Sequence, residues 1–490
     1  MADTLGTRAR VARLLQRTGF DAHPDAVAAA EKDGFEATLD RVLAGGSDHG
    51  ADATPAPDIE PLPPRNSKQQ KQQERREGKR APDGDQRRSE TTARGKTEPE
   101  PDMSAAAHGD RPTTSHDDPV RKHYRAVLKH QREEVTHWWL DRMVAAERPW
   151  AEKRTLLWHN HWATSIQKVK SADAMLRQNE TLRRLGGGDF RTLARAMVVD
   201  PALMVWLDAD GSTAEAPNEN LGRELMELFV LGVGNYTEND VRQAAAALTG
   251  WTVNRRQQPW TAVFKPRRHH QARRNVVGES ADFTARTLVD HLVSLPDSHA
   301  HVAGRMWKSL VSNENAPSRS ALQRVTAAYG KGRDTTAMFR SLFTDDAFAD
   351  PDNVLVKQPV EYVVGSLRAL GVRPARLPEK ARRLLLTRTL AGLGQVPFAP
   401  QSVGGWPAGA AWLTTASAQV RIAFAQALVQ HADLSDIDDA AAPDRPELLA
   451  RKLGVGEWGR TTRDSLRDVA RDPRRITAVA LIAPETLVLS

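Results

Sequence analysis

The chain has 490 residues and no cysteine, and its lysines and arginines exceed its acidic residues by seven. A chain of this length forms either two folded parts or one large body. The lack of cysteine excludes disulfides, thiolate metal sites and a cysteine nucleophile. Eleven basic and five acidic residues lie between Arg65 and Lys96, so the surplus is local. The rest of the chain is nearly neutral and predicts no specific nucleic-acid partner.

The beginning of the sequence carries no targeting pattern. A secretory signal needs a basic segment followed by an apolar run, and residues 1–8 provide neither. No stretch of eighteen apolar residues occurs anywhere in the sequence, so we expect no transmembrane segment. These features predict a cytoplasmic protein.

Residues 1–46 are predicted to form a pair of amphipathic helices that packs on the main body. The second helix begins at Pro24 and runs past Leu39, and Gly45 and Gly46 close the pair. Residues 47–118 are rich in Pro, Gln, Lys, Arg, Glu and Ser and poor in aliphatic side chains. Such a composition buries too little surface to offset the entropy of ordering. We therefore expect a long disordered insert there.

The main domain is expected to span residues 119–490 and to be helical, because apolar residues recur in it at three- and four-residue spacing. One helix begins at a capping box formed by Thr237 and Asp240. Strand signals are scarce and no internal repeat of fixed period occurs. The predicted fold class is all-α, a large irregular multi-helix domain with the insert near its N-terminus. Further helices are predicted at residues 285–295, 299–311, 320–329, 335–342, 358–370, 379–391, 411–431 and 474–482.

The most informative segment is Pro217–Gly232, which combines a helical apolar pattern with several charged side chains. Its start and stop signals are Pro217, Asn218 and Gly232. The acidic residue Glu219 and the basic residue Arg223 lie one helical turn apart. Two further acids lie one turn apart at Glu224 and Glu227. Such pairs are also ordinary on surface helices, so a solvated helix face is the alternative interpretation.

Two histidines lie between two tryptophans in the segment Trp158–Trp162. The tryptophans are four residues apart and are expected in the core. His159 and His161 are two residues apart, and two helical steps rotate by roughly 200°. On an unbroken helix the two imidazoles therefore point apart. The spacing favours polar core, capping or substrate contacts over one shared metal ion, and it identifies no metal or cofactor.

The segment 395–407 is rich in proline and glycine, which fix an irregular backbone around Phe398 and Trp406. Ordered loops often carry function. The same loop could equally close the end of a helical core, and the sequence leaves both interpretations open.

Several separated motifs resemble the large bacterial family catalogued as domain of unknown function 1800. The resemblance extends over nearly the whole chain and rests on the segments Leu14–Phe20, Trp158–Ser165, Pro217–Gly232, Tyr236–Val241, Ala247–Trp251, Lys357–Glu361 and Val403–Pro407. It implies one predominantly helical family domain and brings no activity with it. It also implies that many members are exported and encoded beside a sulfatase-like partner protein. This chain departs from that pattern in its beginning and in its insert.

Two functions follow from the residues. The first is a hydrolase-type enzyme that acts on a polar substrate by acid-base or metal-assisted chemistry, with Glu219, Glu224 and Glu227 as acids, bases or metal ligands. In that hypothesis Arg223 binds an anionic group, and at least one acid faces His159 or His161. The second is a helical scaffold or partner-binding protein whose polar motifs form a buried structural network. A cleft shared by these residues favours the enzyme, and a closed network favours the scaffold.

Overall fold

The computed structural model describes residues 6–63, 65 and 118–489. The chain divides into two compact units, one of Met1–Ile59 with Arg132–Ser490 and one of Glu60–Gln131. In the described part of the smaller unit, the first half of α6 (Pro119–Ala145) is helical, and Gln131 Nε2 donates a 2.7 Å hydrogen bond to the carbonyl of Glu60. Most of the predicted insert, residues 64 and 66–117, lies outside the described residues.

The first part of the segment assigned to the insert is ordered in the larger unit. Residues His49–Asp52 form α4, and Asp48 Oδ1 accepts a 2.9 Å hydrogen bond from the Ala51 amide at its start. Trp138 Nε1 donates to the Thr54 carbonyl at 3.1 Å, and the Ile59 side chain is buried. These few contacts fix residues whose overall composition predicts disorder.

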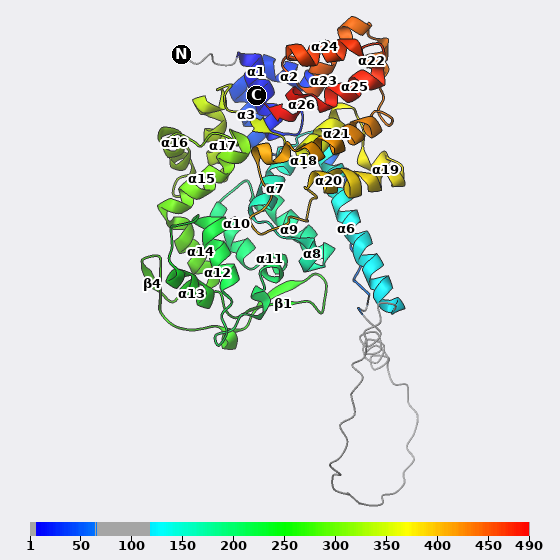
Figure 1. Ribbon diagram of the computed structural model, residues 1–490. Helices are drawn as coiled ribbons and strands as arrows, with labels where there is room; N and C mark the ends of the chain where they lie inside the picture. The colour runs from blue at the N-terminus through cyan, green and yellow to red at the C-terminus, as the bar shows by residue number, and fades with distance from the viewer. Residues whose placement is uncertain (1–5, 64, 66–117, 490) are drawn as a thin grey trace, which may run out of the picture. The chain divides into compact units, whose positions relative to one another are not determined.

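The N-terminal segment forms three helices instead of the expected pair: α1 (Thr7–Thr18), α2 (Pro24–Asp33) and α3 (Phe35–Leu43). Gly34 separates α2 from α3 because its φ of 85° lies outside the helical region. Figure 1 shows these helices in blue, beside α17 and the red C-terminal helices.

Two buried arginines attach α1 to the rest of the larger unit. Arg13 Nη1 donates to the carbonyls of Phe348 and Asp350, at 2.7 Å each. Arg17 donates to four backbone carbonyls, including that of Leu489 near the C-terminus at 3.2 Å. Burial lowers the pKa of Arg17 to about 9, and the nearby charge of Arg13 adds to this effect. Both ends of the chain are thus joined by donors that satisfy buried carbonyls.

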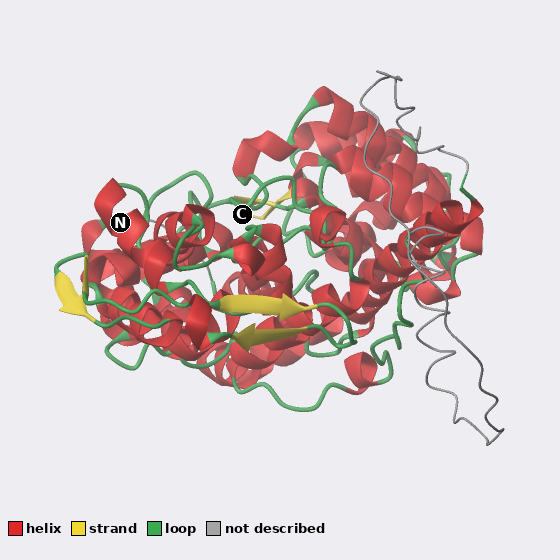
Figure 2. Cartoon of the chain, turned by 90° about the horizontal axis from the view of Figure 1, so that it is seen from below, coloured by secondary structure: helices red, strands yellow, loops and turns green. Residues whose placement is uncertain are grey.

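The predicted all-α class is confirmed, since helices make up most of the larger unit (Figure 2). Its first half contains α7 (Trp150–His161), α8 (Ile166–Val169), α9 (Ala172–Leu185), α10 (Phe190–Val198), α11 (Pro201–Trp206), η1 (Ala209–Gly211), α12 (Glu219–Glu224), η2 (Leu225–Val230), α13 (Glu238–Ala247), η3 (Pro266–Arg268), α14 (Ala285–Ser294), α15 (Pro296–Leu310), α16 (Arg319–Tyr329), α17 (Thr335–Thr344) and η4 (Asp346–Phe348). Its second half contains α18 (Pro359–Ala369), η5 (Pro374–Arg376), α19 (Glu379–Leu384), η6 (Leu385–Leu390), α20 (Ala391–Leu393), η7 (Gly409–Trp412), α21 (Thr415–Leu428), α22 (Ser435–Asp439), η8 (Ala442–Asp444), α23 (Arg445–Leu453), α24 (Arg460–Asp468), α25 (Pro473–Ile482) and α26 (Pro484–Leu487).

Short strands form three antiparallel pairs among the described residues. They are β1 (Trp251–Asn254) with β2 (Thr261–Phe264), β3 (Arg274–Val276) with β4 (Glu279–Ala281), and β5 (Leu355–Val356) with β6 (Val488–Leu489). The β1–β2 hairpin is the most evident pair in Figure 2. The sequence offered few strand signals because each strand is only two to four residues long.

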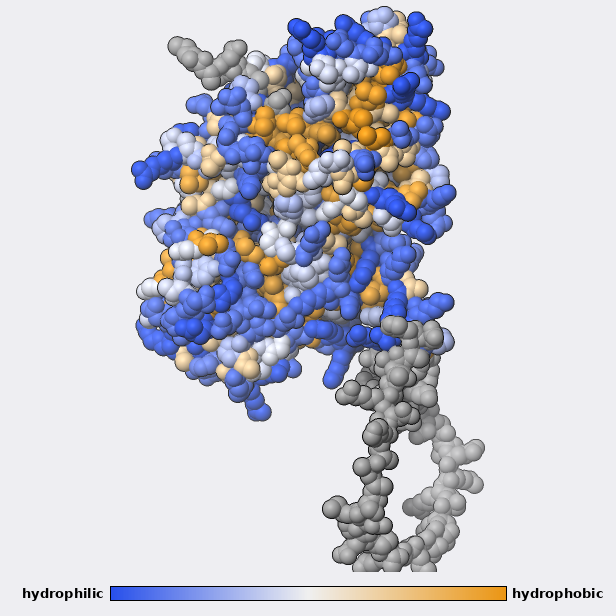
Figure 3. All heavy atoms as spheres, viewed as in Figure 1, coloured by the Kyte–Doolittle hydropathy of each residue, from blue (hydrophilic) through white to orange (hydrophobic). Residues whose placement is uncertain are grey.

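Two large clusters of buried apolar side chains hold the larger unit together. One joins α1–α3 and α7 to the helices between α9 and α17, and the other joins the second half of α6 to the helices from α18 onward. α7 contributes to both, through Trp158 to the first cluster and Leu156 to the second. On the face drawn in Figure 3, hydrophilic residues predominate and hydrophobic ones gather mainly in the upper half. No helix in the described ranges is long and apolar enough to cross a membrane.

Candidate functional site

The end of α7 carries both candidate histidines into the interior. Trp158 and Trp162 are fully buried, as their spacing predicts, and they anchor the last turn of the helix. His159 and His161 are each 1% exposed and face different neighbours. Each imidazole therefore has its own environment and its own role.

His159 holds the loop at residues 395–407. Its Nε2 accepts a 3.1 Å hydrogen bond from the amide of Phe398, a residue with φ of 65°. Its ring contacts Trp139, Phe398 and Trp406 with centroid distances of 5.3 to 5.5 Å. Burial lowers the pKa of His159 to about 3, so the ring is neutral at physiological pH. These contacts make His159 a residue that positions the loop.

Asn160, the residue after His159 in α7, binds the same loop. Its Oδ1 accepts a 2.7 Å hydrogen bond from the amide of Trp406. Gly405 has φ of 84°, and a Cβ at that position would collide with Oδ1 and the carbonyl oxygen of Asn160. Only glycine allows this close approach. The loop closes the core at Phe398, as one of the two interpretations predicted, and it also contributes Trp406 to a cavity described below; whether it carries function stays a prediction.

His161 points toward the π-helix η2. Its Nε2 lies 2.9 Å from the carbonyl oxygen of Phe229, which can only accept, so the proton must be on Nε2. Its Nδ1 is buried and has no hydrogen-bond partner in the structure. Burial lowers the pKa of His161 well below 6.5, and the charges of Arg305 and His301 lower it further. The neutral ring thus presents an unused lone pair.

The π-helix explains why two carbonyls are free to receive histidines. The segment Leu225–Val230 forms π-type bonds in place of the expected α-helix. His161 binds the Phe229 carbonyl, and His301 Nε2 binds the Leu228 carbonyl at 2.9 Å. Single π-turns inside helices are frequent at functional sites. The segment therefore meets His161 through its backbone.

The charged side chains of this segment lie on its outer face. Arg223 forms a two-bond pair with Glu238 at 2.7 and 2.8 Å and a longer contact with Glu219 at 3.4 Å. Glu227 accepts a 2.7 Å hydrogen bond from the Tyr236 hydroxyl. Glu224 is half-buried, and burial followed by the charge of Glu227 raises its pKa.

No hydrogen bond or ion pair within the described ranges joins these acids to either histidine. The four charged residues Glu219, Arg223, Glu224 and Glu227 come together with one another and with α13, but not with His159 or His161. The physical reason is the helix face: Leu225, Met226 and Phe229 occupy the inner side and are fully buried. No group of three or more His, Asp or Glu side chains in the described part of the chain is arranged to hold a metal ion.

A cavity of about 240 Å³ lies beside His161. It is enclosed by the end of α7, by α15, by the start of α18 and by the glycine-rich loop. Its lining residues are Leu157, Asn160, His161, Arg305, Met306, Lys308, Ser309, Asn313, Leu355, Val356, Gln358, Glu361, Gly404, Trp406, Pro407 and Ala408. Three motif segments that are far apart in the sequence, 158–165, 357–361 and 403–407, thus reach one space.

The α18 wall of the cavity carries a paired carboxylate. Glu361 lies 2.5 Å from Lys153 Nζ, and both side chains are nearly buried. Glu361 also accepts a 3.1 Å hydrogen bond from the Gln358 amide at the start of α18. Lys357 is 9% exposed, and burial lowers its pKa to about 8, partly offset by the charge of Glu361. In the sequence, the segment Lys357–Glu361 is notable only as a family motif.

Arg305 was not identified from the sequence. It lies on α15 and lines the cavity, and burial lowers its pKa. Its guanidinium has no ion pair or hydrogen bond to any residue that the structure describes. A lone arginine in an amphipathic helix gives no sequence signal, so only the tertiary structure reveals it.

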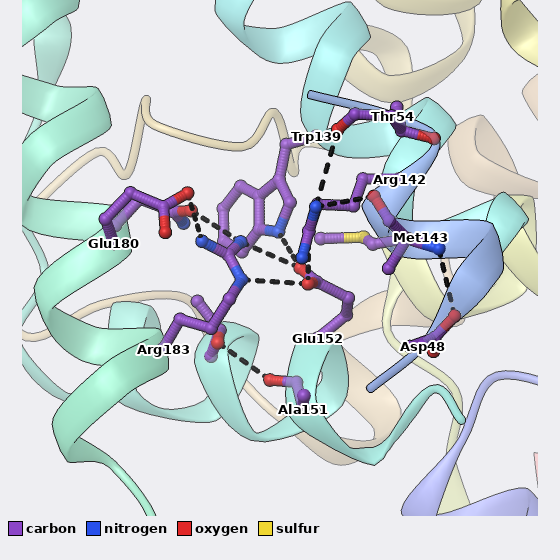
Figure 4. Close-up of polar contacts among 12 residues, drawn as sticks. Asp48, Thr54, Trp139, Arg142, Met143, Ala151, Glu152, Glu180 and Arg183 are labelled. Carbon is purple, nitrogen blue, oxygen red and sulfur yellow. Dashed lines mark hydrogen bonds and ion pairs between the residues drawn. The ribbon is translucent and has the colours of Figure 1, made fainter. Parts of the chain in front are cut away.

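A second polar cluster beside α7 is closed and complete (Figure 4). Glu152 is 1% exposed and accepts hydrogen bonds from Trp139 Nε1 at 2.9 Å, Arg142 Nε at 2.7 Å and two nitrogens of Arg183 at 2.8 Å. Every carboxylate oxygen is satisfied, and this cluster does not line the cavity at His161. It fixes the start of the helix whose other end carries His161.

Comparison with known proteins adds the family. The model of a family described as Protein of unknown function (DUF1800) matches residues 13–488, nearly the whole chain. The chain belongs to this family. No curated protein and no solved structure matches it. Membership in DUF1800 confirms the resemblance carried by the motifs, and three of those motifs supply residues of the cavity.

Proposed function

We propose that this DUF1800 protein is an acid-base enzyme of hydrolase type whose polar substrate binds in the cavity at the end of α7. The proposal rests on one observation: His161 lines the cavity with a buried Nδ1 that has no partner, while its Nε2 is held by the Phe229 carbonyl. In this proposal His161 Nδ1 accepts the proton from a substrate hydroxyl or from an attacking water.

The environment of His161 fits that role. A base whose second nitrogen is bound by a fixed acceptor keeps one tautomer and one ring orientation, as in nucleophile-activating triads. The low pKa keeps the ring unprotonated at neutral pH, so the lone pair is available. Glu361 lines the same cavity, and its pairing with Lys153 fixes the position of its carboxylate and balances its charge.

The residues proposed from the sequence then take supporting roles. His159 positions the loop that carries Trp406, and η2 fixes His161 through a carbonyl. A separate hypothesis is that Glu224 is a catalytic acid, because its carboxylate is half-buried and has no hydrogen-bond partner among the described residues. Glu219, Arg223 and Glu227 are each engaged by a neighbour on the outer face.

A helical scaffold is the second candidate function. It is favoured by the closed cluster around Glu152, in which every acceptor is satisfied and which does not border the cavity. A scaffold needs many such clusters and no catalytic base. The two candidates therefore differ in what His161 does.

The test is hydrolysis of chromogenic carboxylic, phosphate, sulfate and glycosidic esters by the full chain and by His161→Gln. Glutamine keeps an N–H donor for the Phe229 carbonyl and lacks the basic lone pair. We expect a loss of turnover of roughly 100-fold or more with little change in thermal stability. His269→Gln, in a half-buried histidine that does not line the cavity, is the matched control. Equal turnover by both variants, or no turnover of any class by the wild type, would support the scaffold.

Two further expectations concern the cellular setting. We propose a sulfatase-like partner, which the family resemblance implies, and a cytoplasmic location. Co-purification of the tagged full chain from cell fractions tests both together.

A further inference from the structure

The cavity is lined by a half-buried cation without a counter-ion. Arg305 lines it, and its guanidinium donates no hydrogen bond to any described residue. The fully buried arginines behave differently: Arg13, Arg17 and Arg333 each donate to two or more backbone carbonyls. An arginine that is removed from water normally has such partners. The N–H donors of the Arg305 guanidinium are therefore free to bind a ligand.

Two polar atoms in the lining are fully buried and also lack partners. Trp406 is 6% exposed, and its indole Nε1, which can only donate, has no acceptor. His161 Nδ1, which can only accept in the tautomer fixed by Phe229, has no donor. Buried polar groups are nearly always satisfied. Other buried atoms among the described residues also lack partners, but these two and Arg305 border one cavity, where a single ligand would complete them.

The charge balance of the lining favours an anion. Arg305 and Lys308 are cationic, and Glu361 is the one acid among the lining residues. Its charge is already engaged by Lys153 at 2.5 Å. An entering negative group thus meets an unpaired guanidinium and a neutralised carboxylate.

We propose that the cavity binds an anionic oxygen group, a carboxylate, phosphate or sulfate, with the Arg305 guanidinium as its main partner and the Trp406 indole N–H as a second donor. The fork of N–H groups on arginine matches such oxyanions with two parallel hydrogen bonds. The cavity, at about 240 Å³, takes a compact group. That this group belongs to the substrate rests on the proposed function; the binding of the anion does not.

The test measures binding of inorganic phosphate, sulfate and acetate to the full chain by calorimetry, at constant ionic strength set with sodium chloride. We expect saturable binding of at least one anion, and the order of the three separates a carboxylate site from a phosphate or sulfate site. Arg305→Met should weaken that binding by about tenfold or more, the effect of losing hydrogen bonds to a charged group. Arg286→Met removes an exposed arginine outside the cavity and should change it by less than about twofold.

Several results would overturn the proposal. They are absence of binding by the wild type, unchanged binding by Arg305→Met, and equal weakening by Arg286→Met. Arg305→Lys keeps the positive charge but lacks the forked N–H groups of the guanidinium, so it should weaken anion binding several-fold. It is measured in place of Arg305→Met if the methionine variant does not fold. Unchanged binding by the lysine variant would contradict the role of the fork. His161→Gln should still bind the anion, so loss of turnover and loss of anion binding test the two proposals separately.

Discussion

Replacing Glu152 by glutamine tests how firmly α7 is held. Glutamine has the same shape, but it removes the charge and places an amide N–H₂ against the donors of Arg142 and Arg183 (Figure 4). Removing one partner of a buried ion pair costs about 3–5 kcal/mol. Arg183 keeps its bonds to Glu180 and Asn179, so we expect the lower end, about 3 kcal/mol.

The effect should depend on pH in a defined direction. Burial alone would raise the pKa of Glu152, but the charges and hydrogen bonds of Arg183 and Arg142 hold it below the ordinary 4.5. A carboxylate with a lowered folded-state pKa stabilises the protein above its unfolded-state pKa. That contribution is lost as the pH falls through the folded-state pKa. The gap between wild type and variant should therefore be constant above about pH 5.5 and shrink as the pH falls below about 4.5.

Urea unfolding followed by circular dichroism at several pH values measures this gap. Glu180→Gln is the matched control, because Glu180 pairs with the same arginine but is 48% exposed, against 1% for Glu152. We expect a change below about 1 kcal/mol for the control. Similar losses for both variants, or a gap for Glu152→Gln that does not depend on pH, would refute the assignment of this cluster as a buried charged anchor.

Three other experiments test the loop at residues 395–407, the outer face of the segment Pro217–Gly232 and His161 as the base. Gly405→Ala should destabilise the protein by about 2 kcal/mol or more in thermal unfolding, because the added Cβ collides with Asn160 and the residue has a positive φ. Gly404→Ala is the control, because its Cβ makes only an ordinary contact. Equal effects of the two variants would contradict the close approach of Gly405 to Asn160. If His161 is the base, Glu224→Gln should change stability by less than about 0.5 kcal/mol and leave turnover intact; loss of turnover alone would support the separate hypothesis that Glu224 is a catalytic acid. Turnover by the His161-based site, as kcat/KM against pH, should show no limb near pH 6.5, because the pKa of His161 lies well below that value.

The helices were predictable because their signals are local. The capping box at Thr237 and Asp240 is present, and α14, α16 and α25 begin and end within one residue of the predicted bounds. The π-helix η2 was not predictable, because α and π segments of six residues share nearly the same apolar spacing. The break at Gly34 was missed because the apolar pattern continues across it.

The site was only partly predictable for a different reason. The sequence indicated three of the right segments, those around His161, Glu361 and Trp406, but contacts among residues hundreds of positions apart leave no periodic signal. The charge pattern drew attention to Arg223, which the fold pairs with Glu238 on the outer face. Arg305, which lines the cavity and has no partner among the described residues, lies in a helix for which the sequence predicted no function.

The contrast between the two polar clusters beside α7 is the strongest argument for function. At one end of the helix Glu152 has every oxygen satisfied, as a purely structural cluster requires. At the other end His161 and Trp406 have buried polar atoms without partners around a cavity, and the half-buried Arg305 beside them has no partner among the described residues. Unsatisfied buried groups cost stability, and a ligand that enters the cavity would recover that cost for His161 and Trp406 together.

The same geometry links the anion to the base. Burial is the main cause that lowers the pKa of His161, and the charge of Arg305 lowers it further. An anion bound to Arg305 would offset that charge and raise the pKa of His161 toward neutral pH, where a general base works best. Binding of the correct group would therefore strengthen the base that acts on it, and a neutral analogue that fills the cavity would not.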